Sequence, residues 1–91
     1  MVSSGTNIRV YNNLIYSQSN TATTHGIEIN SNAIKAQLYN NTIDSNPGYG
    51  IVVGASNVSG TVIKNNLISS NVKGAINVSG TETILGSNLV Q

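Results

Sequence analysis

The sequence contains no cysteine, tryptophan or phenylalanine, and it has a single proline and a single histidine. Without cysteine, the chain can form neither a disulfide framework nor a thiolate metal site. Charged residues make up 8% of the chain, against about 25% in typical soluble domains. The basic residues are scattered singly at Arg9, Lys35, Lys64 and Lys73. Because nucleic-acid binding depends on clustered positive charge, this distribution argues against a nucleic-acid partner.

Long apolar runs are also missing. No window approaches the roughly 18 consecutive apolar residues of a membrane-spanning helix, and the opening "MVSSGTNI" lacks the apolar core of a signal peptide. We therefore expect no contact with a membrane, and the sequence indicates no cellular compartment. A chain of 91 residues predicts one small domain, residues 1–91.

The abundant polar residues belong to a few types. Asparagine occurs 15 times, serine 12, glycine 9 and threonine 8. Isoleucine, valine and leucine recur throughout, so the composition is not that of a disordered chain. Asparagine and glycine readily adopt left-handed backbone conformations, and this composition therefore favours short strands joined by turns.

Internal repeats organise the chain. Four similar segments are "RVYNNLI" at 9–15, "QLYNNTI" at 37–43, "VIKNNLI" at 62–68 and "ILGSNLV" at 84–90. A second series lies between them, with "HGIEI" at 25–29, "YGIVV" at 49–53 and "GAINV" at 74–78. Short runs in which apolar and polar residues alternate predict strands. Strands that recur every 22 to 28 residues, with no helix between them, can bury their inner faces by stacking on the next unit of a parallel solenoid.

The units "GIEINSNAIKAQLYNNTIDSN" and "GIVVGASNVSGTVIKNNLISSN" resemble the repeat of right-handed parallel β-helix proteins, the pectin-lyase-like superfold. The resemblance extends from about Val2 to Val90. It implies an all-β fold, a short right-handed parallel β-helix of about four rungs with three parallel sheets and an Asn ladder. In that family the ladder stands at the turn between the second and third sheets, and here the matching residues are Asn13, Asn41, Asn66 and Asn88. We expect each of them to adopt a positive φ and to hydrogen-bond the next amide along the ladder.

Alternation along the strands predicts which side chains face inward and which face outward. The expected inward residues are Ile27, Ile29, Ile51, Val53, Ile76 and Val78 on the first sheet, Ile8, Val10, Ala36, Leu38, Ile63 and Leu85 on the second, and Ile15, Ile43, Ile68 and Val90 on the third. The expected outward columns are Glu28, Val52 and Asn77 on the first sheet, Arg9, Gln37, Val62 and Ile84 on the second, and Leu14, Thr42, Leu67 and Leu89 on the third.

Four outward residues of the later rungs are apolar, namely Val62, Ile84, Leu67 and Leu89. Apolar patches of this kind are uncommon on monomers. One interpretation is an interface of a homo-oligomer, and the other is a surface covered by a loop or by further rungs of a longer chain. The strand edges at both ends of the solenoid are also open to pairing, either with more rungs or with another copy.

The resemblance further implies a polysaccharide groove on the outer face of the first sheet and on the turns leading into it. The residues at matching places are His25, Glu28 and Tyr49, with Asn77 farther along. We therefore take these four as candidate ligand-binding residues. Val52 and Asn77 stand where the enzymes of this fold need further acids, so we predict no catalytic residue, metal site or cofactor.

The small number of carboxylates disfavours catalysis, since the chain contains only Glu28, Asp44 and Glu82. Glycoside hydrolysis needs two carboxylates within about 5–9.5 Å, and Ca²⁺ needs six to eight oxygen ligands. The segment "DSNPG" at 44–48 begins like a calcium loop, but Ala55 stands where the loop requires glutamate. We predict a turn there, in which Pro47 sets φ and Gly48 takes the unusual backbone angles.

Two functions stay open from the sequence. The first is a non-catalytic β-helix module with a structural or self-assembly role, with weak polysaccharide binding as an added feature. The second is a fragment of a polysaccharide lyase or glycoside hydrolase whose catalytic residues lie elsewhere.

Overall fold

The computed structural model describes residues 2–17, 24–54, 58–79 and 83–91, and describes Ser31 by its backbone alone. The strands are β1 (Val2–Thr6), β2 (Arg9–Tyr11), β3 (Leu14–Tyr16), β4 (Ile27–Ile34), β5 (Gln37–Tyr39), β6 (Thr42–Asp44), β7 (Tyr49–Val53), β8 (Val62–Lys64), β9 (Leu67–Ser69), β10 (Gly74–Val78), β11 (Ile84–Gly86) and β12 (Leu89–Val90). No helix occurs in these ranges. The strands are two to eight residues long, and most of them are followed by asparagine, serine or glycine, which favour turns.

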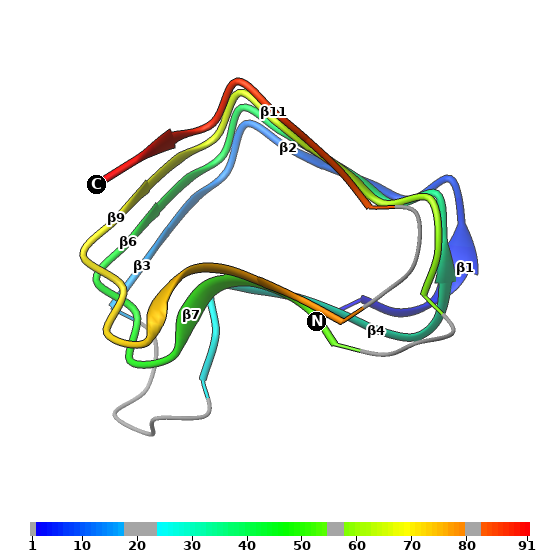
Figure 1. The fold of residues 1–91 in the computed structure, drawn as a ribbon, viewed down its shortest axis with the longest axis horizontal. Helices are drawn as coiled ribbons and strands as arrows, with labels where there is room; N and C mark the ends of the chain where they lie inside the picture. The colour runs from blue at the N-terminus through cyan, green and yellow to red at the C-terminus, as the bar shows by residue number, and fades with distance from the viewer. Residues whose placement is uncertain (1, 18–23, 55–57, 80–82) are drawn as a thin grey trace.

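The strands form three parallel four-stranded sheets. The first sheet has the order β1-β4-β7-β10, the second β2-β5-β8-β11 and the third β3-β6-β9-β12. Each sheet takes one strand from each rung, so the strands of one sheet lie over one another along the shortest axis of the molecule (Figure 1). The all-β solenoid with three parallel sheets that the repeats predict is confirmed.

The pairing registers reproduce the predicted columns. Glu28 pairs with Val52 and Val52 with Asn77 on the first sheet. On the second sheet the column runs Arg9, Gln37, Val62 and Ile84, and on the third it runs Leu14, Thr42, Leu67 and Leu89. Register was predictable because a slip of one residue would move a whole apolar set from the core to the surface.

The chain turns between sheets at single residues with positive φ. Between the second and third sheets these residues are Asn12 at 59°, Asn40 at 56°, Asn65 at 57° and Ser87 at 42°. The prediction that the ladder residues themselves take a positive φ is therefore wrong. In each Asn-Asn pair the first residue adopts the left-handed backbone, and the second is left free to place its amide inside the turn.

The turn after the third sheet is built in the same way. Ser45 has φ of 56° and Ser70 has φ of 53°, whereas Gly48 is not in the left-handed region. The role predicted for Gly48 is thus wrong. Glycine is needed there for space, since an added Cβ would lie 2.8 Å from the carbonyl oxygen of Thr24 and would also overlap the His25 ring.

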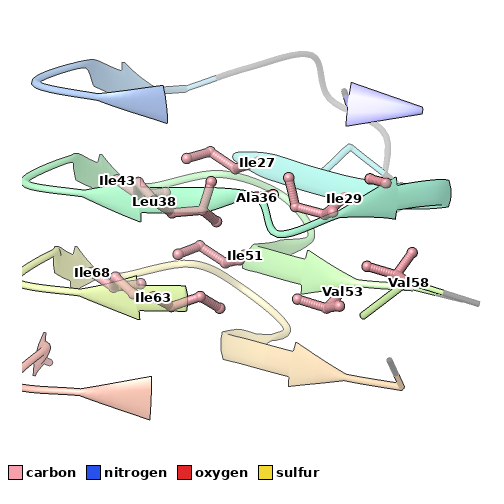
Figure 2. Close-up of a cluster of buried hydrophobic side chains, with 11 residues drawn as sticks. Ile27, Ile29, Ala36, Leu38, Ile43, Ile51, Val53, Val58, Ile63 and Ile68 are labelled. Atoms are coloured by element: carbon pink, nitrogen blue, oxygen red, sulfur yellow. The ribbon is translucent and has the colours of Figure 1, made fainter. Parts of the chain in front are cut away.

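The hydrophobic core fills the two middle rungs, β4–β6 and β7–β9. Its fully buried members come from all three sheets and point into the space between them (Figure 2). The core residues are Ile27, Ile29, Ala33, Ala36, Leu38, Ile43, Ile51, Val53, Val58, Ile63 and Ile68. Each fully buried aliphatic side chain of this size contributes about 1.5–3 kcal/mol to folding. Sequence reasoning missed two of these residues, Ala33 and Val58.

Ala33 and Val58 were missed because the cross-section has a further side. The second half of β4 runs along this further side, where Ala33 pairs with Gly5 of β1 (Figure 1). On the side of β4 opposite to β1, Ile34 forms an isolated parallel bridge with Ser59. The segments concerned, "SGT", "NAI" and "VSG", share no apolar alternation from which this side could have been predicted.

Three of the predicted inward residues of the fourth rung are largely exposed, whereas Ile76 in the same rung packs against the core. Leu85 is 55% exposed, Val90 53% and Val78 39%. They face the interior, but each has a neighbouring rung on one side only. Burial in a solenoid requires a rung on both sides.

Candidate functional site

The Asn ladder occupies the turn between the second and third sheets. Asn13 N and Nδ2 donate to Asn41 Oδ1 at 3.2 and 3.1 Å. Asn41 N and Nδ2 donate to Asn66 Oδ1 at 2.9 and 3.0 Å, and Asn66 N and Nδ2 donate to Asn88 Oδ1 at 3.0 and 2.9 Å. The predicted ladder is therefore present in all four rungs.

Three of the four ladder amides also donate a hydrogen bond to the preceding rung. Nδ2 of Asn41, Asn66 and Asn88 donates to the carbonyl oxygens of Val10, Leu38 and Ile63, respectively, at 2.9, 3.0 and 2.9 Å. Asn41 and Asn66 are only 1% exposed, and a buried amide without partners would cost several kcal/mol. The ladder thus satisfies the polar groups of the turn and joins the rungs to one another.

A second, shorter ladder lies at the turn after the third sheet. Asn46 N and Nδ2 donate to Asn71 Oδ1 at 3.0 and 2.9 Å, and Asn71 Nδ2 donates to the carbonyl oxygen of Ile43 at 3.2 Å. Sequence reasoning missed this ladder. The signal was present, because Asn46 and Asn71 are 25 residues apart, as are Asn41 and Asn66, and each follows a serine.

The candidate ligand residues on the turn into the first sheet contact one another. Tyr49 N donates to His25 Nδ1 at 3.0 Å, and the two ring centroids lie 5.8 Å apart at 36°. A Cβ added to Gly74 would lie 3.3 Å from the Tyr49 ring. Tyr49 therefore packs between His25 of one rung and Gly74 of the next. Because His25 Nδ1 accepts a hydrogen bond, the neutral ring carries its proton on Nε2.

Glu28 and Asn77 lie in one outward column, two rungs apart, with Val52 between them. Neighbouring parallel strands are about 4.8 Å apart, so the two polar side chains are separated by about twice that spacing. Asn30 Nδ2 donates to Glu28 Oε1 at 3.3 Å. The structure thus brings His25 and Tyr49 together, whereas Glu28 contacts Asn30 and is separated from Asn77 by Val52. Their role as ligand-binding residues stays a prediction.

Asp44 lies on the outer face of the third sheet, in register with Ser69. Ser69 Oγ donates to Asp44 Oδ1 at 2.6 Å, and Ser45 Oγ donates to Asp44 Oδ2 at 2.8 Å. These hydrogen bonds, the one from Ser69 first, hold the pKa of the Asp44 carboxyl below its ordinary value because they favour the charged form. Asp44 links two rungs and belongs to a different sheet from Glu28.

The four apolar outward residues flank the Asn ladder on both sides. We call Val62, Ile84, Leu67 and Leu89 the apolar seam. Val62 pairs with Ile84 on the second sheet, and Leu67 pairs with Leu89 on the third. Ile84 and Leu89 are 53% and 57% exposed. One pair lies on each of the two sheets that join at the turn between β11 and β12 (Figure 1).

A comparison with protein-family models matches residues 1–90 to the right handed beta helix region. The chain belongs to this family. No curated protein and no solved structure matches it. The family match agrees with the two ladders and with the column registers of this right-handed β-helix.

The carboxylates in the described part of the β-helix lie apart from one another. Within residues 2–17, 24–54, 58–79 and 83–91 there is no pocket and no cluster of three or more potential metal ligands. The two acids in these ranges, Glu28 and Asp44, lie on different sheets, and Glu82 lies outside the described residues. The same ranges hold no helix that is long and apolar enough to cross a membrane.

Proposed function

We propose that this right-handed β-helix is a structural module that associates with further copies of itself through the apolar seam. The observation that carries the proposal is that, on each side of one corner, an exposed apolar side chain (Ile84 or Leu89) pairs with a half-buried one (Val62 or Leu67). Of the other outward positions in these two columns, Arg9, Gln37 and Thr42 are polar, and Leu14 is apolar but lies in the first rung, apart from the seam. Clustered apolar side chains on a surface gain free energy when they are removed from water.

The rigidity of the corner supports this role. Asn66 and Asn88, which the seam flanks, are fixed to each other and to the neighbouring rung by hydrogen bonds. A surface held in place before binding loses little conformational entropy on association. The seam can therefore contribute to affinity even though few residues form it.

The test is the double substitution Leu67→Glu with Leu89→Glu, which places two charges in the seam. We expect the assembly to dissociate, measured by sedimentation velocity, while the β signal in far-UV circular dichroism is retained. The control is Leu14→Glu, because Leu14 lies in the same outward column but outside the seam and is 65% exposed. An unchanged mass for the double variant would contradict the proposal.

Polysaccharide binding on the outer face of the first sheet is the second candidate. The contact between His25 and Tyr49 favours it, because an aromatic side chain beside polar groups suits the faces and edges of a sugar ring. A glycan array that compares the parent chain with Tyr49→Ala tests it. We expect binding that the substitution removes, and the absence of binding by the folded parent chain would contradict this candidate.

A further inference from the structure

The Asn ladder has a direction. In each of its three steps, N and Nδ2 of the earlier residue donate to Oδ1 of the later residue. The first residue, Asn13, accepts no hydrogen bond on Oδ1 from any described residue, and the backbone N of the last residue, Asn88, has no acceptor among them. One end of the molecule therefore presents an amide acceptor, and the other end presents an amide donor.

We propose that the two ends bind each other, so that a second copy of this chain stacks head to tail on the fourth rung. Asn88 N and Nδ2 would donate to Oδ1 of Asn13 in the second copy, and Nδ2 of that Asn13 would donate to the carbonyl oxygen of Leu85. These bonds repeat the geometry of the three internal steps. The inference rests on the proposed structural role. Its contacts are made by the ladder and the inward side chains of the end rungs, whereas the seam consists of outward side chains.

The apolar residues at the two ends are complementary in the same register. Continuing the columns places Leu85 against Val10 of the second copy, and Val90 against its Ile15. Leu85 and Val90 are more than half exposed, whereas Val10 and Ile15 are half-buried and pack against the core cluster. Stacking would extend the hydrophobic core across the junction, with one β-strand spacing between the copies.

The size of the junction is sufficient for a specific but weak contact. The cross-section measures 28 by 26 Å, so two stacked ends would together bury roughly 1,100 Å², near the lower limit for specific interfaces. We therefore expect association that depends on concentration rather than a permanent dimer.

The direction of the ladder also disfavours the symmetric arrangements. Two copies joined by their fourth rungs would bring donors against donors, and two joined by their first rungs would bring acceptors against acceptors. A head-to-tail dimer still has one free first rung and one free fourth rung. Further copies can therefore add at both ends, so the contact forms open chains rather than a closed dimer.

The experiment uses the 91-residue chain carrying Leu67→Glu and Leu89→Glu, so that the seam does not contribute. We expect its average mass by sedimentation equilibrium to rise with concentration above the 9.5 kDa of one chain. Adding Leu85→Lys and Val90→Lys should return the mass to one chain, because the lysines replace exposed apolar side chains at the junction. The control is Val72→Lys, which adds a charge at a side chain that is 79% exposed and lies on neither surface.

A mixing experiment tests the direction. A chain blocked at its first rung by Val10→Lys, or by Asn13→Lys if the first variant loses its β signal, is mixed with the chain blocked at its fourth rung. Each should be monomeric alone, and the mixture should contain a complex of two chains and nothing larger. Dimers formed by either blocked chain alone would overturn the head-to-tail arrangement.

The outcomes separate this inference from the proposed function. If the seam substitutions leave the mass of the parent chain unchanged while Leu85→Lys with Val90→Lys lowers it, the seam proposal fails and the stacking proposal stands. If the seam-blocked chain stays at one chain's mass at every concentration, the stacking proposal fails. The ends would then be covered by something other than a second copy.

Discussion

The middle rungs and the fourth rung share one sequence pattern but differ in burial. Leu38 and Ile63 are fully buried, whereas Leu85, in the same inward column, is 55% exposed. The side chains are chemically alike and point the same way. The difference shows that alternation sets direction, while the rungs on either side set burial.

The largest expected effect comes from truncating one inward leucine in each region. Leu38→Ala should lower the free energy of unfolding by about 2–5 kcal/mol, because it removes buried methyl groups and leaves a cavity. Leu85→Ala should lower it by about 1 kcal/mol or less, since much of that side chain is already in water. Urea denaturation at a concentration where the chain is monomeric measures both, and equal losses would contradict the distinction.

The ladder permits the same comparison with polar groups. Asn66→Ala should cost about 2–3 kcal/mol, because it leaves Asn41 N and the carbonyl oxygen of Leu38 buried without these partners. Asn13→Ala should cost less than about 1 kcal/mol, because Asn13 is exposed and water replaces its hydrogen bonds. Thermal unfolding followed by circular dichroism would rank the two variants. A larger loss for Asn13→Ala would reverse the expected order.

Two glycines extend the comparison between the third and fourth rungs. Here the expected effect depends on the space around an added methyl group rather than on hydrogen bonds. A Cβ on Gly50, in the third rung, would lie 2.6 Å from Ile68 Cγ2 and 2.8 Å from the carbonyl oxygen of Ala75. Gly50→Ala should therefore cost about 1–3 kcal/mol by overpacking. On Gly86, in the fourth rung, the nearest atoms would be those of the flexible Lys64 side chain at 3.3 Å. Gly86→Ala should leave the urea midpoint almost unchanged, and a matching loss would show that the fourth rung is as constrained as the third.

The smallest expected effect concerns Asp44, which accepts a hydrogen bond from Ser69 of the next rung. In the first rung the same column is occupied by Tyr16, which has no carboxylate. The depressed pKa of Asp44 means that its contribution to stability is present above its unfolded pKa of about 3.8 and is lost as the pH falls through the lower folded value. Ser69→Ala should raise the pKa of Asp44, as measured by carbon-13 NMR titration. Ser45→Ala should raise it less, and an unchanged pKa in Ser69→Ala would contradict the assigned cause.

Much of the fold was predictable because its causes are local and repeated. The Asn-Asn pairs located the ladder, and the apolar alternation located the strands and their register. The left-handed conformation was predicted for Asn41, but Asn40 adopts it. The sequence does not distinguish which of two adjacent asparagines turns the chain. Asn46 and Asn71 were overlooked because a "DSNPG" turn explained Asn46 equally well without its neighbour.

The candidate sites were less predictable than the fold. The sequence placed Tyr49 near Glu28, but the structure pairs Tyr49 with His25 and Gly74, because the turn brings the preceding rung against the ring. Glu28 instead accepts a hydrogen bond from Asn30 on its own strand. Contacts between side chains of different rungs depend on rotamers and turn geometry, which no spacing in the sequence specifies.

The sequence by itself determined the strands, their order in three sheets and the columns that face in or out, because the period of two residues and the repeat of about 25 residues are written in it. The tertiary structure alone decided which inward residues are buried, which asparagine turns the backbone and which ladder groups lack a partner. The physical reason is that burial and hydrogen bonding are properties of neighbouring rungs, and the first and fourth rungs each have a neighbour on one side only.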